Sequence, residues 1–100
     1  MAEAGSRSPV KADPAAGQLL ISLRIDSEAV VRSNCIWALG RLMDQLVQPR
    51  QAEIVEALVS ALLHDGEISV RDEARTALEQ LEDPLVLERL QTLISDGFIL

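Results

Sequence analysis

Apolar residues recur at helical spacing along most of the chain. From residue 15 onward they follow one another at steps of one, three and four, which is the pattern of helices with a single apolar face. No segment alternates apolar and polar residues as a half-buried strand does. Turn-forming residues divide the pattern at Asp26, Pro49, Asp65-Gly66 and Asp83-Pro84. The pattern predicts an all-α chain of about five helices with short connections, in which Ser27 is an N-cap and Gly66 a left-handed helix terminator.

The first fourteen residues differ from the rest. They read MAEAGSRSPVKADP, in which glycine, serine and proline interrupt any period and most apolar residues are alanine. This composition predicts a flexible tail over 1–14, followed by one helical domain over 15–100. The tail lacks the apolar run of a secretory signal, and no window of the chain is apolar enough to span a bilayer.

The helical pattern contains an internal repeat. At an offset of 39 residues, identical residues recur from the first connection through the helix that follows it. The matching pairs are Asp26/Asp65, Glu28/Glu67, Val31/Val70, Arg32/Arg71, Ala38/Ala77, Leu39/Leu78, Leu42/Leu81 and Asp44/Asp83. The last helix matches the helix over 50–64 at an offset of 31, through Val55/Val86, Leu62/Leu93 and Asp65/Asp96. The repeat divides the domain into a single helix over 15–25 and two helix pairs, over 26–64 and 65–97.

The repeated motif is Asp-x-x-x-x-Val-Arg, present at 26–32 and at 65–71 and followed by Ala-Leu. It resembles the HEAT repeat family, including the HEAT-like repeats of phycobilisome lyases. The resemblance covers about residues 15–100 and implies a right-handed α-solenoid of antiparallel helix pairs, about two and a half repeats long. It also implies that first helices line the convex face and second helices the concave face.

The aspartate and arginine of the motif form a ladder between neighbouring repeats in this family. The ladder positions in this chain are Asp26, Arg32, Asp65, Arg71 and Asp96. Physical chemistry supports the same role, because a planar guanidinium can bond both a carboxylate and the free carbonyls at a helix end. We therefore expect these residues to be structural.

Charge excludes one class of partner and favours another. The chain has 9 basic and 16 acidic residues, a net charge of −7, so it lacks the basic residues that neutralise phosphates in nucleic-acid binders. An acidic solenoid surface favours a protein partner with a basic segment. The single cysteine excludes an internal disulfide and, with no export signal, favours the cytoplasm or the nucleus.

The sequence offers no catalytic, cofactor or metal residues. One histidine and one cysteine on different helices do not make a zinc site, and Cys35 aligns with Ala74, as a small core residue would. We expect a non-catalytic interaction or scaffold module. A HEAT-like lyase activity is a remote alternative that would require a reactive Cys35.

The candidate partner-binding positions lie mainly on the second helices. They are Gln51, Glu53, Glu56, Ser60, Glu88 and Gln91, together with Trp37 of a first helix. Trp37 is expected to pack on the preceding repeat. The alternative is an exposed anchor for a partner, with Arg41 stacked on its ring.

Both ends of the predicted stack carry apolar residues. They are Leu19, Leu20, Ile21 and Leu23 at the first end, and Leu87, Leu90 and Phe98–Leu100 at the last. Uncovered apolar ends are unfavourable in a short solenoid. Either the chain is a fragment or short isoform of a longer solenoid, or it self-associates through its ends. The second case corresponds to an alternative function, that of a structural subunit packed end to end in a larger assembly.

Overall fold

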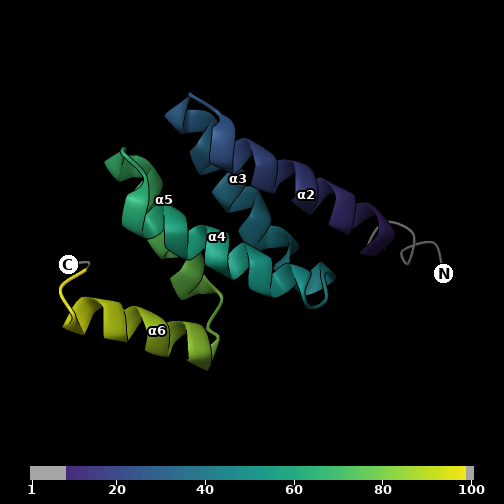
Figure 1. The fold of residues 1–100 in the computed structure, drawn as a ribbon. Coiled ribbons are helices and arrows are strands. Elements are labelled where there is room, and N and C mark those ends of the chain that lie inside the picture. Colours follow the sequence, from purple (N-terminus) through teal and green to yellow (C-terminus); the bar gives the residue numbers. More distant parts are fainter. Residues whose placement is uncertain (1–8, 99–100) are drawn as a thin grey trace.

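The computed structural model describes residues 9–98, and all of the regular structure there is helical. The elements are α2 (Pro9–Ile25), α3 (Ala29–Leu42), a short 3-10 turn η1 (Met43–Gln45), α4 (Arg50–His64), α5 (Ile68–Gln80) and α6 (Pro84–Ser95) (Figure 1). No strand occurs among these residues. The predicted all-α class is confirmed.

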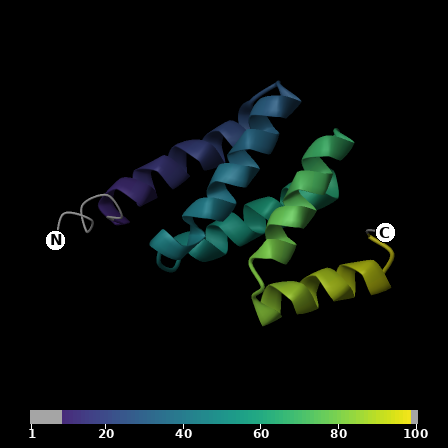
Figure 2. The ribbon, with the colours of Figure 1, turned by 180° about the vertical axis from the view of Figure 1, so that it is seen from behind.

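The helices stack in the order that the repeat predicts. The single second helix α2 packs along α3, and α4 packs along α5. The two first helices, α3 and α5, also lie against each other, while α6 lies at the far end of the stack next to α5 (Figures 1 and 2). The architecture is therefore an α-solenoid of about two and a half repeats.

An aspartate lies in each of the three connections that lead into α3, α5 and α6. The carboxylates of Asp26, Asp65 and Asp83 each accept a hydrogen bond from the backbone N–H two residues ahead, at 2.8, 3.0 and 2.9 Å. Such bonds satisfy donors that a helix start leaves free. The expected N-cap at Ser27 is wrong, because Asp26 supplies the oxygen. The expected left-handed Gly66 is also wrong, since positive φ occurs at Glu82 and Gly97.

The first helix begins six residues earlier than the sequence pattern suggests. α2 starts at Pro9 and continues through Pro14, so residues 9–14, assigned to the flexible tail, are helical. Proline removes one backbone hydrogen bond there, but two contacts hold the turn in place. Ala12 is buried, and the carboxylate of Asp13 binds the Arg50 guanidinium of α4 at 2.9 Å. Residues 1–8 of the predicted tail lie outside the described part of the chain.

One apolar core runs through the stack. Its largest completely buried side chains come from four helices and are Leu20, Ile36, Leu39, Ile54, Leu58, Val70 and Leu78. No polar or charged side chain within residues 11–98 is buried. Any binding site in this part of the chain therefore lies on the surface.

The two ends are less apolar than the sequence suggests. Leu20 and Leu23 at the first end, and Leu90 at the last, are buried in the common core, since each helix turns them toward its neighbour. Ile21, Leu87 and Phe98 are exposed, as expected for an open end. Ile99 and Leu100 lie outside the described residues.

Candidate interaction surfaces

Arg32 links the two repeats. Its Nε and Nη2 donate to the two carboxylate oxygens of Asp65 at 2.9 and 3.0 Å, and its Nη1 donates to the backbone carbonyl of Asp26 at 2.8 Å. The side chains of Arg32 and Asp65 are only 15% and 10% exposed. The hydrogen bonds from Arg32 hold the pKa of the Asp65 carboxyl below its ordinary value. A single guanidinium therefore joins the end of α2, the start of α3 and the connection that leads into α5.

Arg71 repeats only half of this arrangement. Its Nη1 donates to the carbonyl of Asp65 at 2.7 Å, as Arg32 does to Asp26. Within residues 9–98, however, no carboxylate lies within ion-pair distance of Arg71, and the exposed Asp96 takes no part. The structure thus brings Asp26, Arg32, Asp65 and Arg71 into one network and leaves Asp96 outside it.

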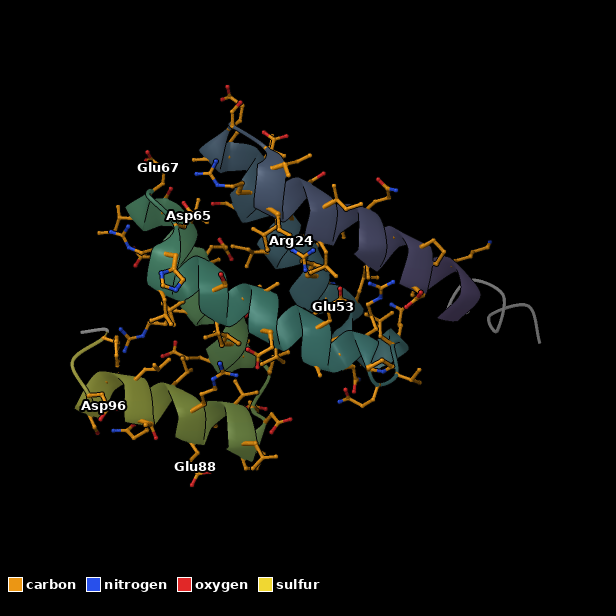
Figure 3. All side chains as sticks on the ribbon, in the orientation of Figure 1. Arg24, Glu53, Asp65, Glu67, Glu88 and Asp96 are labelled. Carbon is orange, nitrogen blue, oxygen red and sulfur yellow. The ribbon has the colours of Figure 1, made fainter. Side chains whose placement is uncertain are left out.

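The carboxylates proposed for the second-helix face are already paired. Glu53 lies 2.8 Å from Arg50 of its own helix and 3.8 Å from Arg24 of α2. Figure 3 shows the side chains of Glu53 and Arg24 turned toward each other. Glu56 pairs with Arg89 of α6, and this hydrogen bond lowers the pKa of the Glu56 carboxyl. These pairs neutralise the surface formed by α2, α4 and α6. The surface expected to form an acidic groove therefore carries little net negative charge.

The remaining second-helix candidates are scattered. Ser60 and Gln91 are exposed on different helices, and Glu88 points away from α4 (Figure 3). Gln51 is half-buried, and its amide donates to the carbonyl of Met43 at 2.8 Å. The structure does not bring these four residues together.

A more acidic surface lies on the other side of α4, at the junction of the two repeats. Here a hollow of about 550 Å³ is lined by Trp37, Arg41, Asp44, Gln51, Glu73 and Asp83, among others; we call it the Trp37 hollow. Trp37 is 56% exposed, so its expected packing on a preceding repeat is wrong. The guanidinium carbon of Arg41 lies 4.9 Å from the centre of the Trp37 ring. The indole is exposed, as the alternative expects, and its role as an anchor for a partner stays a prediction.

The acids of the Trp37 hollow have no cationic partner within residues 9–98, although Asp83 accepts the backbone N–H of Leu85. Asp44, Glu73 and Asp83 form no ion pair with any cation of residues 9–98, while Arg41 is a single positive charge among them. These three acids are not among the partner-binding positions predicted from the sequence. Asp44 and Asp83 were detectable as an identical pair one repeat apart, but nothing local indicates that Glu73 lies beside them.

The residues that could support catalysis are not arranged for it. No group of three or more histidine, cysteine, aspartate or glutamate side chains among the described residues could hold a metal ion. Cys35 is 4% exposed. Its burial raises the pKa of the thiol, and the nearby Asp26 carboxylate acts in the same direction. A protonated, covered thiol is a poor nucleophile.

We therefore expect native Cys35 to react slowly with a thiol reagent. Labelling at neutral pH should be at least about a hundredfold slower in the native protein than in denaturant, because it requires local or global opening. Mass spectrometry over a time course measures both rates. Equal rates in the two conditions would show an accessible thiol and revive the lyase alternative.

Comparison with known proteins identifies one family. The family model described as HEAT repeats matches residues 14–98, which is nearly the whole described part. No curated protein and no solved structure matches the chain. None of the helices within residues 9–98 has the length and apolarity to cross a membrane. HEAT repeats are commonly protein-interaction scaffolds and are typically non-catalytic. The length of the match shows that the chain belongs to the HEAT repeat family.

Proposed function

We propose that this protein is a non-catalytic interaction module whose Trp37 hollow receives a basic segment of a partner protein. The family favours such a role, since its members present extended surfaces to other proteins. A cytoplasmic or nuclear setting fits the free, buried Cys35 thiol.

The observation that supports this choice of surface is the difference in charge pairing between two faces. On the second-helix face, Glu53 and Glu56 are neutralised by arginines. In the Trp37 hollow, Asp44, Glu73 and Asp83 line the same surface as an exposed tryptophan, and none of these carboxylates forms an ion pair with a cation of residues 9–98. Unpaired carboxylates attract a basic segment and speed its encounter. An exposed indole supplies apolar area and a face for a cation.

The test uses a fluorescent peptide rich in arginine and lysine, titrated with the whole protein and followed by anisotropy. Asp44→Lys should weaken binding by about tenfold, because it replaces an attraction with a repulsion at the binding surface. Trp37→Ala should weaken binding by a similar factor. Binding should also decrease as salt rises.

The matched control is Glu88→Lys. It makes the same change of charge at an exposed position that points away from α4, so we expect less than about a twofold change in affinity. If Glu88→Lys and Asp44→Lys weaken binding equally, the peptide responds only to net charge and the Trp37 hollow is not the site. Binding that does not depend on salt would instead favour the structural alternative of apolar end packing.

A further inference from the structure

The first helices α3 and α5 meet through two different faces. On α3 the face includes Gly40, where an added Cβ would lie 3.8 Å from the Cβ of Ala77, and Ile36, one turn before it and completely buried. On α5 the face holds Ala77 together with the buried Val70 and Ala74. Every first helix that lies between two others in such a stack must present both faces.

The repeat shows which of these faces is left uncovered at each end. The α5 positions equivalent to Ser33, Ile36, Gly40 and Met43 are Asp72, Arg75, Glu79 and Glu82. These four are charged, and none of them is buried. The side of α5 that lies away from α3 is therefore polar, as expected of an end that faces water.

The corresponding side of α3 is apolar. The α3 positions equivalent to Val70, Ala77 and Leu81 are Val31, Ala38 and Leu42, which we call the N-terminal face; Cys35, the equivalent of Ala74, is buried. All three are only half-buried, because no first helix precedes α3 within residues 9–98. Ala38 and Leu42 line a hollow of about 440 Å³ on this side, which shares Trp37, Arg41 and Asp44 with the Trp37 hollow.

A carboxylate adjoins this apolar face. The Asp65 carboxylate accepts a hydrogen bond from the backbone N–H of Glu67 and two more from Nε and Nη2 of Arg32. Asp26, its equivalent one repeat earlier, has the same backbone bond to Glu28. Its carboxylate forms no ion pair with any described residue. Arg32 thus binds the carboxylate of Asp65, whereas no arginine of the described residues binds the equivalent carboxylate of Asp26.

We propose that the N-terminal face binds an amphipathic helix of a partner protein. The α3–α5 contact serves as the template for this helix. The helix would carry an arginine in its first turn to bond Asp26, a branched apolar residue four positions later, and a glycine or other small residue after four more, opposite Ala38. In this chain that pattern is Arg32, Ile36 and Gly40.

Charge distinguishes this occupant from a second copy of the chain. A second copy would have to bind through its α5, in which Arg71, Arg75 and Glu79 are equivalent to Arg32, Ile36 and Gly40. Arg71 could bond Asp26, but Arg75 and Glu79 would be buried against an apolar face, which is unfavourable for charged side chains. The interface proposed here continues the α3–α5 contact; Val31 and Ala38 belong to it and not to the Trp37 hollow, while Trp37, Arg41 and Asp44 border both.

The test uses a labelled peptide of residues 29–45 with Cys35 replaced by serine, added to the whole protein and followed by anisotropy. We expect binding that Ala38→Glu weakens by about tenfold, because it places a charge on the apolar face. Asp26→Asn should weaken binding by about fivefold. The amide can still accept from Glu28, so the connection keeps its shape. In a peptide with Arg32→Gln, the effect of Asp26→Asn should disappear.

Three outcomes would overturn the proposal. The first is no binding at peptide concentrations up to about 1 mM, which corresponds to a negligible interaction. The second is binding that Asp65→Asn weakens while Asp26→Asn does not, because the peptide would then have replaced α3 inside the stack. The third is a dimer of the protein alone, seen by light scattering and abolished by Ala38→Glu, because a second copy would then be the occupant.

Discussion

Replacing Ile36 by alanine is expected to lower the free energy of unfolding by about 2–4 kcal/mol, the range for a large aliphatic residue removed from a packed core. Ile36 is completely buried and lies on the face of α3 that meets α5. A domain of this size has only about 5–15 kcal/mol of stability in total. The variant should therefore unfold at markedly lower denaturant, as measured by circular dichroism.

The matched control is Arg75→Ala, at the equivalent position one repeat later. Arg75 is half-buried on the polar side of α5 and lies 3.4 Å from Glu79. Surface pairs of this kind contribute at most about 1 kcal/mol, so the loss should be small. Equal losses at Ile36 and Arg75 would contradict the conclusion that α3 packs against α5 through its Ile36 side while the equivalent side of α5 is polar.

The fold was largely predictable because the repeat places equivalent residues in equivalent surroundings. Leu39 and Leu78, one repeat apart, are both completely buried, and the offset that relates them also relates α3 to α5. The start of α2 was not predictable in this way. Residues 9–14 have no repeat partner in the pattern, and Asp13 is held by Arg50, 37 residues away in sequence.

The contacts of the candidate sites were likewise predictable where they belong to the repeated motif, and not where they join residues distant in sequence. The contact of Arg32 with Asp65 follows from a local motif that occurs twice. The neutralisation of Glu56 depends on Arg89, which is 33 residues away and on another helix, so the sequence overstated the acidity of the second-helix face. Trp37 was misplaced for a related reason, since its expected packing required a preceding first helix that the described residues do not supply.

Replacing Asp65 by alanine is expected to lower the free energy of unfolding by about 2–3 kcal/mol, because it leaves the half-buried Arg32 guanidinium without its carboxylate. The matched control is Asp26→Ala. It removes the same kind of backbone bond at a connection but no ion pair, so it should lower stability by only about 1 kcal/mol. The double variant Arg32→Ala/Asp65→Ala should lose less than the sum of the two single variants. Additive losses would mean that the pair contributes nothing beyond its separate contacts.

The same pair gives the protein a defined response to acid. In the folded state, the hydrogen bonds from Arg32 hold the pKa of Asp65 below its ordinary value of 3.8, whereas in the unfolded chain the carboxyl returns to that value. The unfolded state therefore binds the proton more tightly, and the contribution of Asp65 is fully present above about pH 5. It is lost as pH falls below about 4 toward the folded pKa. The pKa of Arg32 is raised, so the arginine stays charged throughout.

Denaturant unfolding at pH 7, 5, 4 and 3 should show a smaller loss of stability between pH 5 and pH 3 for Asp65→Ala than for the unsubstituted protein. Parallel losses in the two proteins would mean that other carboxyl groups, such as Glu56, account for the acid response.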